Sequence, residues 1–174
     1  DLDVENFPTV LIGVAGQPVF YGVLLPHIQT LERLVQDAAS MCPLAENVAL
    51  PLAEYTDLPP ELIREIVRMK LGLVNLAGYE NHMPSELSGG MRKRAGLARA
   101  MALDPMFLFF DEPWAGLDPV TAAELDILIR SLNEGTGTTM VFVTQELASI
   151  FSLAQRVIML HRDVKGIIAR GAPQ

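Results

Sequence analysis

The chain has 174 residues, a formal net charge of −8 at pH 7 and an apolar content of 50%. This length fits one domain with a sizeable core, and the acidic balance argues against nucleic acid or an anionic membrane surface as the main partner. The single cysteine, Cys42, excludes an internal disulfide and favours a reducing cytosolic compartment, while no apolar run approaches the ~20 residues of a membrane span.

The N-terminal half begins with β-rich runs and continues with helical patterns. Residues 9–15 and 18–25 predict two strands separated by a Gly-Gln-Pro turn. Residues 44–103 are expected to be helical, with Pro60 opening one helix and Gly72 closing it. This helix carries an apolar stripe that we expect to belong to the core, formed by Leu62, Ile63, Ile66 and Val67.

A Ser-Gly-Gly turn then precedes a basic helix. Ser88 is a residue type preferred at a helix N-cap, and Gly89 and Gly90 allow backbone amides to approach a ligand without a Cβ in the way. The helix that begins near Met91 presents unpaired N–H groups and the positive end of its dipole at this turn, which suits a phosphate. Taken alone, such a turn more often precedes an ordinary capped helix that binds no ligand.

An apolar strand and two carboxylates follow. Residues 106–110 show no alternation of polar and apolar side chains, which favours a strand buried on both faces of a parallel sheet. Asp111 and Glu112 come at its carboxyl end, where open α/β sheets place their ligands. One carboxylate there can hold Mg²⁺ through its water shell while the other polarises an attacking water. A strand that simply exits to solvent through acidic residues explains the pair equally well.

The remaining segment alternates between helix and strand. Asp118 at an N-cap and Pro119 at the first helical position predict the start of a helix that runs to about residue 133. The expected elements after it are a strand (139–144), a helix (146–154), a strand (156–160) and a last strand (166–170). Such alternation predicts a parallel sheet with right-handed crossovers.

In this order and spacing, the motifs resemble those of ABC-transporter ATPases. The matching segments are 87–91 for the signature motif, 107–112 for the Walker B strand and 115–118 for the D-loop. Residues 46–52 and 84–86 are similar to the ATPase subunit of phospholipid transporters that work with MCE proteins, the maintenance-of-lipid-asymmetry type. The resemblance covers roughly residues 36–171.

The resemblance implies roles for the Ser-Gly-Gly turn and for the helix-capping Asp118. Ser88, Gly89 and Gly90 would contact the γ-phosphate of an ATP held by the opposite subunit. Asp118 would link the two nucleotide sites across the dimer. ATP would therefore lie between two such subunits.

The resemblance also implies a metal-binding and catalytic set. Asp111 would bind the Mg²⁺ shell, and Glu112 would act as the general base. Gln36 stands in the place of the Q-loop glutamine, which touches the nucleotide-bound Mg²⁺ and senses the membrane subunit. The alternative for Gln36 is a surface polar residue at a strand end.

Two departures from the family pattern matter. No G-x-x-x-x-G-K-[ST] loop occurs in the sequence, and none of its three lysines, Lys70, Lys93 and Lys165, follows a glycine. Gln145 occupies the position of the family's switch histidine, and an amide can donate a hydrogen bond but cannot carry charge. Gln145 is therefore expected to be a weakened catalytic switch, with a neutral variant as the alternative.

The sequence thus predicts an α/β fold: a P-loop NTPase-like parallel sheet with a helical subdomain, incomplete at the N-terminus. We expect an N-terminal β-rich remnant (1–35), the Q-loop and helical subdomain with the signature motif (36–103) and the Walker B, D-loop and switch portion (104–174), in one domain overall.

The expected function is an ATP-binding and ATP-hydrolysing subunit for phospholipid transport across the cell envelope, with ATP and Mg²⁺ as cofactors. The expected partners are a second ATPase subunit, an integral membrane permease and an MCE-domain protein, without nucleic acid, at the inner face of the cell membrane. This chain alone is expected to be inactive. Two alternatives remain: a non-hydrolysing regulatory subunit that lends its signature motif to a partner, and an interaction module without nucleotide chemistry.

Overall fold

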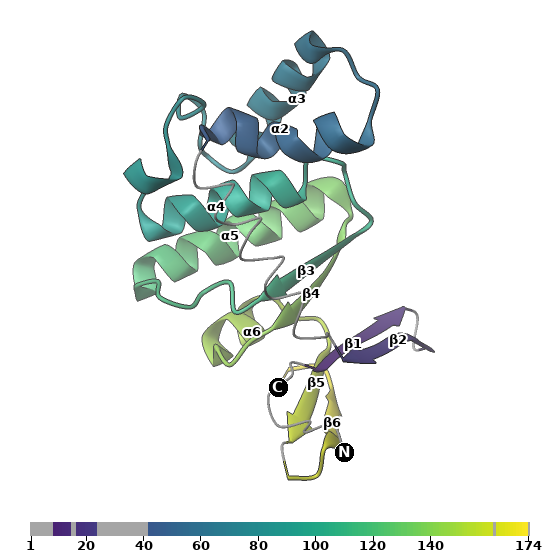
Figure 1. Ribbon diagram of the computed structural model, residues 1–174. Helices are drawn as coiled ribbons and strands as arrows, with labels where there is room; N and C mark the ends of the chain where they lie inside the picture. The colour runs from purple at the N-terminus through teal and green to yellow at the C-terminus, as the bar shows by residue number, and fades with distance from the viewer. Residues whose placement is uncertain (1–8, 15–16, 24–41, 162, 174) are drawn as a thin grey trace. The chain divides into compact units, whose positions relative to one another are not determined.

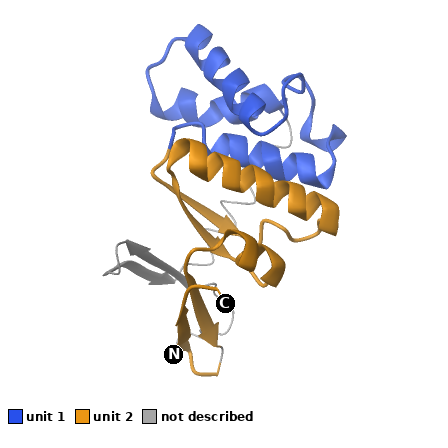
Figure 2. Ribbon diagram, turned by 180° about the vertical axis from the view of Figure 1, so that it is seen from behind, with its two compact units in different colours: residues 1–104 blue, residues 105–174 orange. Residues whose placement is uncertain are grey.

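The computed structural model describes residues 9–14, 17–23, 42–161 and 163–173, with side chains from residue 42 onward. The chain divides into two compact units, Asp1–Asp104 and Pro105–Gln174, coloured separately in Figure 2. Gln36 and the expected boundary between residues 35 and 36 lie outside the described residues. Each unit is built from its own set of secondary-structure elements.

An antiparallel hairpin opens the first unit. Strand β1 (Thr9–Val14) pairs with β2 (Gln17–Val23), starting with Thr9 opposite Val23. The register shifts by one residue between Ile12 and Gly13, as at a β-bulge. The two strands expected from the sequence are therefore present.

Three helices form the rest of the first unit: α2 (Leu44–Tyr55), α3 (Pro60–Leu73) and α4 (Gly89–Ala100), with the short η1 (Pro84–Glu86) before α4 (Figure 1). The helices pack against one another, and each contributes apolar side chains to the buried interior. The buried residues of these helices include Leu44, Val48, Leu52, Val67, Leu71, Leu97 and Ala98.

The apolar stripe expected to be core on α3 is only partly buried. Val67 is buried, but Leu62 remains 45% exposed because the inward face of α3 is turned toward Lys70 and Leu71 instead. Consequently α3 also presents an outer apolar ridge, which comprises Leu62, Ile66, Met69 and Leu73.

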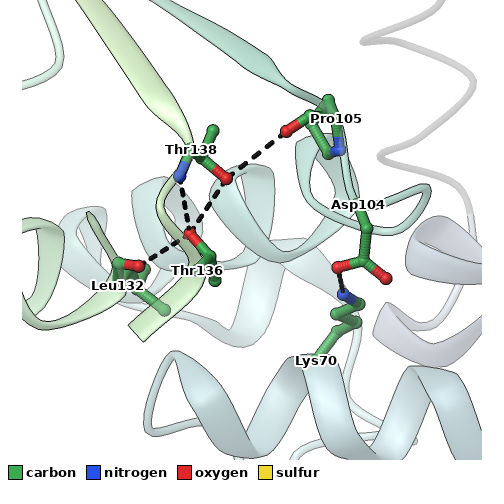
Figure 3. A network of polar contacts seen from close by, with 6 residues as sticks. All are labelled: Lys70, Asp104, Pro105, Leu132, Thr136 and Thr138. Carbon is green, nitrogen blue, oxygen red and sulfur yellow. Dashed lines mark hydrogen bonds and ion pairs between the residues drawn. The ribbon is translucent and has the colours of Figure 1, made fainter. Parts of the chain in front are cut away.

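Lys70 is an unusual member of this buried face. Its side chain is only 2% exposed, and its Nζ forms an ion pair with Asp104, whose side chain is 72% exposed (Figure 3). Asp104 has a φ of 47°, in the left-handed region that Asn and Asp tolerate better than most residues. The ion pair therefore ties α3 to the last residue of the first unit.

We expect Asp104→Asn to lower the free energy of unfolding by roughly 1–3 kcal/mol, because it leaves the buried ammonium of Lys70 without its countercharge. The solvation of Asp104 keeps this cost below that of a fully buried pair. Lys70→Met should cost less, about 1 kcal/mol at most, since it leaves only an exposed carboxylate unpaired. Urea denaturation compares the variants, with the exposed Asp57→Asn as control. A larger loss from Lys70→Met than from Asp104→Asn would contradict this asymmetry.

The second unit contains a parallel strand pair joined by a helix. Strand β3 (Phe107–Asp111) pairs with β4 (Thr139–Val143), with Phe107 opposite Thr139 and Asp111 opposite Val143. Helix α5 (Pro119–Thr136) connects the two strands, and α6 (Leu147–Leu153) follows β4 and packs against α5. The parallel pairing and the helical crossover confirm the expected α/β arrangement.

Helix α5 runs three residues further than the sequence suggested. The Thr136 hydroxyl donates to the Leu132 carbonyl at 2.8 Å, and Gly137 ends the helix at a φ of 67°, a conformation that glycine adopts readily. The buried Thr138 then donates from its hydroxyl to the Pro105 carbonyl at 3.3 Å (Figure 3). This bond joins the starts of β3 and β4, next to the backbone bond from the Thr139 amide to the Met106 carbonyl at 3.0 Å.

A second antiparallel hairpin ends the described chain. Strand β5 (Val157–His161) pairs with β6 (Gly166–Gly171), so among the described strands β5 does not join the parallel pair as the alternation had suggested. A short connection between strands favours antiparallel pairing, and Lys165, at a φ of 47°, lies just before β6. Within the described parts of the chain, no helix combines the length and hydropathy needed to cross a membrane.

Candidate functional site

The β3–β4 register places two carboxylates at the carboxyl end of the parallel pair. Asp111 is the exposed last residue of β3, and the Glu112 amide donates to the Val143 carbonyl at 2.9 Å, which extends the ladder by one residue. Glu112 adopts a φ of 43°, which is strained for a residue with a long side chain. Strained residues are often found at functional sites, although Asp104 and Lys165 also have positive φ outside this strand end.

The side chain of Glu112 is held by the loop that follows β4. The Thr144 hydroxyl donates to Glu112 Oε2 at 3.1 Å, and its oxygen accepts from the Glu146 amide at 3.0 Å. The exposed Gln145 lies between Thr144 and Glu146 in the sequence. The structure thus brings the carboxylate of Glu112 next to the loop that contains Gln145.

Thr144 is a candidate site residue that motif reasoning missed. The available signal was its place in the sequence, immediately after the apolar end of a strand and immediately before Gln145. A hydroxyl there can both donate and accept, so it can join a carboxylate to a backbone amide. Its contact with Glu112 depends on a pairing between residues 32 positions apart, which local spacing does not reveal.

A compact turn of residues 112–118 leads from the carboxylates to α5. The Ala115 amide donates to the Glu112 carbonyl at 3.1 Å, and the Leu117 amide donates to the Trp114 carbonyl at 3.1 Å. Gly116 has a φ of 77°, which a residue with a side chain would adopt only with strain. The turn is therefore held by its own backbone hydrogen bonds.

Asp118 caps α5 as the sequence indicated. Its Oδ1 accepts from the amides of Val120 and Thr121, each at 3.0 Å, and its Oδ2 accepts from the Thr121 hydroxyl at 2.5 Å. The hydroxyl and then the amide of Thr121 lower the pKa of this carboxyl below its usual range. The stabilisation is thus present above the unfolded-state pKa and is lost as the pH falls through the folded-state pKa.

Ser88 caps α4 in the first unit. Its Oγ accepts from the Met91 amide at 3.2 Å. The amides of Gly89 and Gly90 lie in the first turn of the helix, where no carbonyl of the same helix can accept from them. Ser88 and Gly89 are exposed, so this turn has the form of an anion-binding helix terminus.

The carboxylates fit a metal ion that is held mainly by phosphate and water. No group of three or more His, Cys, Asp or Glu side chains suited to a metal occurs among the residues the structure describes. Mg²⁺ at nucleotide sites usually takes only one or two carboxylates, together with waters and phosphate oxygens. Asp111 can supply such a carboxylate beside Glu112, whereas a closed protein cage would need more ligands.

Comparison with known proteins gives sequence relatives for this arrangement. Residues 24–115 match the family model described as ABC transporter. The chain is 46% identical over 129 residues to the intermembrane phospholipid transport system ATP-binding protein MlaF of Haemophilus influenzae, covering 74% of this chain and 48% of that protein. It is also 46% identical over 119 residues to the probable ribonucleotide transport ATP-binding protein mkl of Mycobacterium tuberculosis, covering 68% and 33%. The chain therefore spans at most about half the length of these relatives.

Solved structures show the same fold. The chain aligns with cbiO1 of Clostridium perfringens, part of the cbiONQ complex, with a TM-score of 0.72 and 21% identity, covering 90% of this chain and 67% of that one. The dimeric ATP-binding cassette MJ0796, described in a post-hydrolysis state with ADP and Pi, aligns with a TM-score of 0.66 and 26% identity, covering 90% and 75%.

Proposed function

This chain belongs to the ABC transporter family, and from that premise we propose that it is an ATP-binding and ATP-hydrolysing subunit of a transporter. The observation that carries the proposal is the strained Glu112, whose amide bonds to β4 and whose carboxylate bonds to the loop containing Gln145. An acidic side chain held in this way at the end of a parallel strand is suited to activate a water.

In this proposal the two carboxylates have different tasks. Asp111, at the exposed end of β3, holds the water shell of Mg²⁺, which neutralises charge on the phosphates when it is bound. Glu112 accepts a proton from the water that attacks the terminal phosphate. Thr144 orients the carboxylate of Glu112 by its donated hydrogen bond.

The glycine turn supplies the second half of a shared nucleotide site. We assign Ser88, Gly89 and Gly90 to the terminal phosphate of an ATP held by the opposite subunit, because a helix terminus that exposes Ser88 and Gly89 favours an anion. Asp118 then connects one site to the other across the pair of subunits. Gln36 is proposed as a further contact to Mg²⁺ from its position in the sequence alone.

The proposed cargo is a phospholipid. The similarity to MlaF covers a larger share of this chain than the similarity to mkl, and residues 46–52 and 84–86 follow the pattern of lipid-transport ATPases. By resemblance to such transporters, we propose a membrane permease and an MCE-domain protein as partners, and the subunit would work at the inner face of the cell membrane. The outer apolar ridge of α3 supports a protein partner for this helix.

Gln145 favours a second candidate function. An amide cannot change its charge during turnover, so a subunit with glutamine at this position could retain nucleotide contacts yet hydrolyse slowly. Such a subunit would lend Ser88, Gly89 and Gly90 to a partner's site and regulate it. The two candidates differ in whether Glu112 is used.

Replacing Gln145 with histidine should raise ATP turnover by about tenfold, because an imidazole in the loop that bonds to Glu112 can donate a hydrogen bond and carry a proton. The measurement is steady-state ATP hydrolysis by the natural protein that contains this chain, assembled with its partner subunits. Gln155→His, the same change at another exposed glutamine, is the matched control. An equal rate for Gln145→His and wild type would show that this position is not the switch.

The proposed function itself is tested by Mg²⁺-dependent ATP hydrolysis in the same assembly. Hydrolysis that requires Mg²⁺ supports the first candidate. Nucleotide binding without hydrolysis supports the second candidate. The absence of nucleotide binding would overturn both and leave an interaction module.

A further inference from the structure

Trp114 lies in the middle of the turn of residues 112–118, between the candidate base Glu112 and the helix-capping Asp118. It is only 5% exposed, whereas its neighbours Ala115 and Gly116 are exposed. Protein interiors are closely packed, so a buried indole must fit among its neighbours. The surrounding side chains therefore fix its position. Trp114 is also the only tryptophan in the chain.

Aromatic contacts join the indole to the strand pair. Its ring centroid lies 5.5 Å from that of Phe142 on β4, at an interplanar angle of 33°. Phe142 in turn stacks on Phe110 of β3, with centroids 4.5 Å apart and an angle of 15°. These three rings form a continuous contact from the turn to both strands of the parallel pair.

A polar contact joins the same indole to α5. The Nε1–H group of Trp114 donates to Asp126 Oδ1 at 2.7 Å. Asp126 lies about two turns along the helix that Asp118 caps, so this bond holds the helix as well as the turn. A short N–H bond to a carboxylate is stronger than one between neutral groups and has a defined direction.

We propose that Trp114 is a positioning residue that fixes Glu112 and Asp118 relative to each other. It does so by anchoring the turn to β4 through Phe142 and to α5 through Asp126. Without these contacts the middle of the turn loses its attachment to β4 and α5, so the two ends, although each keeps its own hydrogen bonds, can shift relative to each other. The inference rests on the proposed ATPase function, since it concerns the geometry of that site.

The kinetic test compares kcat with KM. Trp114→Phe keeps an aromatic ring against Phe142 but loses the N–H group, and Asp126→Leu removes the acceptor. Each should lower kcat about tenfold and leave KM for ATP within about twofold of wild type, because misplaced catalytic groups slow chemistry more than binding. Asp126→Asn retains an oxygen acceptor and should recover most of the rate. Glu124→Gln, an exposed acid on the same helix, is the matched control.

The double variant separates positioning from two unrelated defects. If Trp114 and Asp126 act as one unit, Trp114→Phe combined with Asp126→Leu should lower kcat about tenfold, as each single change does. Independent effects would multiply to about a hundredfold. A multiplied loss, or single variants with unchanged kcat, would overturn the inference.

Two further readouts need no ATPase activity. Asp126→Leu should shift the fluorescence maximum of Trp114, and it should accelerate hydrogen exchange at the Ala115 and Leu117 amides, whose bonds hold the turn. Unchanged exchange would overturn the positioning role even in a protein that hydrolyses ATP well. If the wild type does not hydrolyse ATP but the variant still shows faster hydrogen exchange, the proposed function is wrong and the positioning role stands.

Discussion

Glu112→Gln is expected to lower ATP turnover by ~10²–10⁴, the usual contribution of a general base. Glutamine has nearly the same shape and keeps an oxygen that can accept from the Thr144 hydroxyl, so the turn should remain in place. What disappears is the capacity to accept a proton from the attacking water. Nucleotide affinity should therefore change little while turnover falls. Steady-state hydrolysis and fluorescent-nucleotide titration of the same preparation measure the two effects.

Glu134→Gln provides the control for this substitution, since Glu134 is an exposed acid in the last turn of α5. It should leave turnover unchanged. Retention of more than about a tenth of the wild-type rate by Glu112→Gln would show that another group takes the proton. Glu112 would then be a structural residue whose strain has a different origin.

Ser88→Arg is expected to lower turnover by ~10², because it places a large side chain where a phosphate should approach the amides of Gly89 and Gly90. The assay uses a mixed assembly in which the opposite subunit carries a complete phosphate-binding loop, since the glycine turn is proposed to act on that subunit's ATP. Ser85→Arg, at an exposed serine in η1, is the matched control. Equal rates for the two arginine variants would exclude the proposed phosphate contact.

Loss of the helix cap could by itself destabilise α4, typically by ~1 kcal/mol. Ser88→Asp separates the two effects, because aspartate is a good N-cap but repels a phosphate. It should preserve the unfolding midpoint and still lower turnover. Normal turnover in Ser88→Asp would mean that Ser88 serves only as a cap.

Together these variants distinguish the two candidate functions. A hydrolysing subunit needs both Glu112 in its own site and Ser88 in its partner's site. A regulatory subunit needs only Ser88, so Glu112→Gln would then leave turnover of the mixed assembly unchanged. The pattern of the two losses is thus more informative than either rate alone.

Local patterns were sufficient to predict most of the secondary structure. Asp118 and Pro119 predicted the start of α5 because a capping carboxylate followed by proline is strongly preferred at this position, and the structure has both hydrogen bonds of the cap. The uninterrupted apolar run before Asp111 predicted a strand buried on both faces; the strand is present as β3, but only Leu108 is buried and Phe109 is 51% exposed. These features depend on residues close together in the sequence.

The features that needed the structure depend on contacts between distant residues. The inward face of α3 was predicted only in part, because the stripe did not include Lys70, which is buried and forms an ion pair with a residue 34 positions away. The sequence pattern also did not show whether β5 would pair with β6 or join the parallel pair of β3 and β4. The roles of Thr144 and Trp114 arise from neighbours across the parallel pair, which a motif does not encode.

The left-handed backbone of Glu112 carries a consequence for the evolution of this protein. Asparagine or glycine would relax the backbone there, by on the order of 1–2 kcal/mol of local strain, but neither could serve as the base. The fold thus retains a left-handed conformer at the position where the proposed chemistry needs a long carboxylate. Selection for thermal tolerance alone would be expected to discard this glutamate, so its persistence among variants would itself report selection for catalysis.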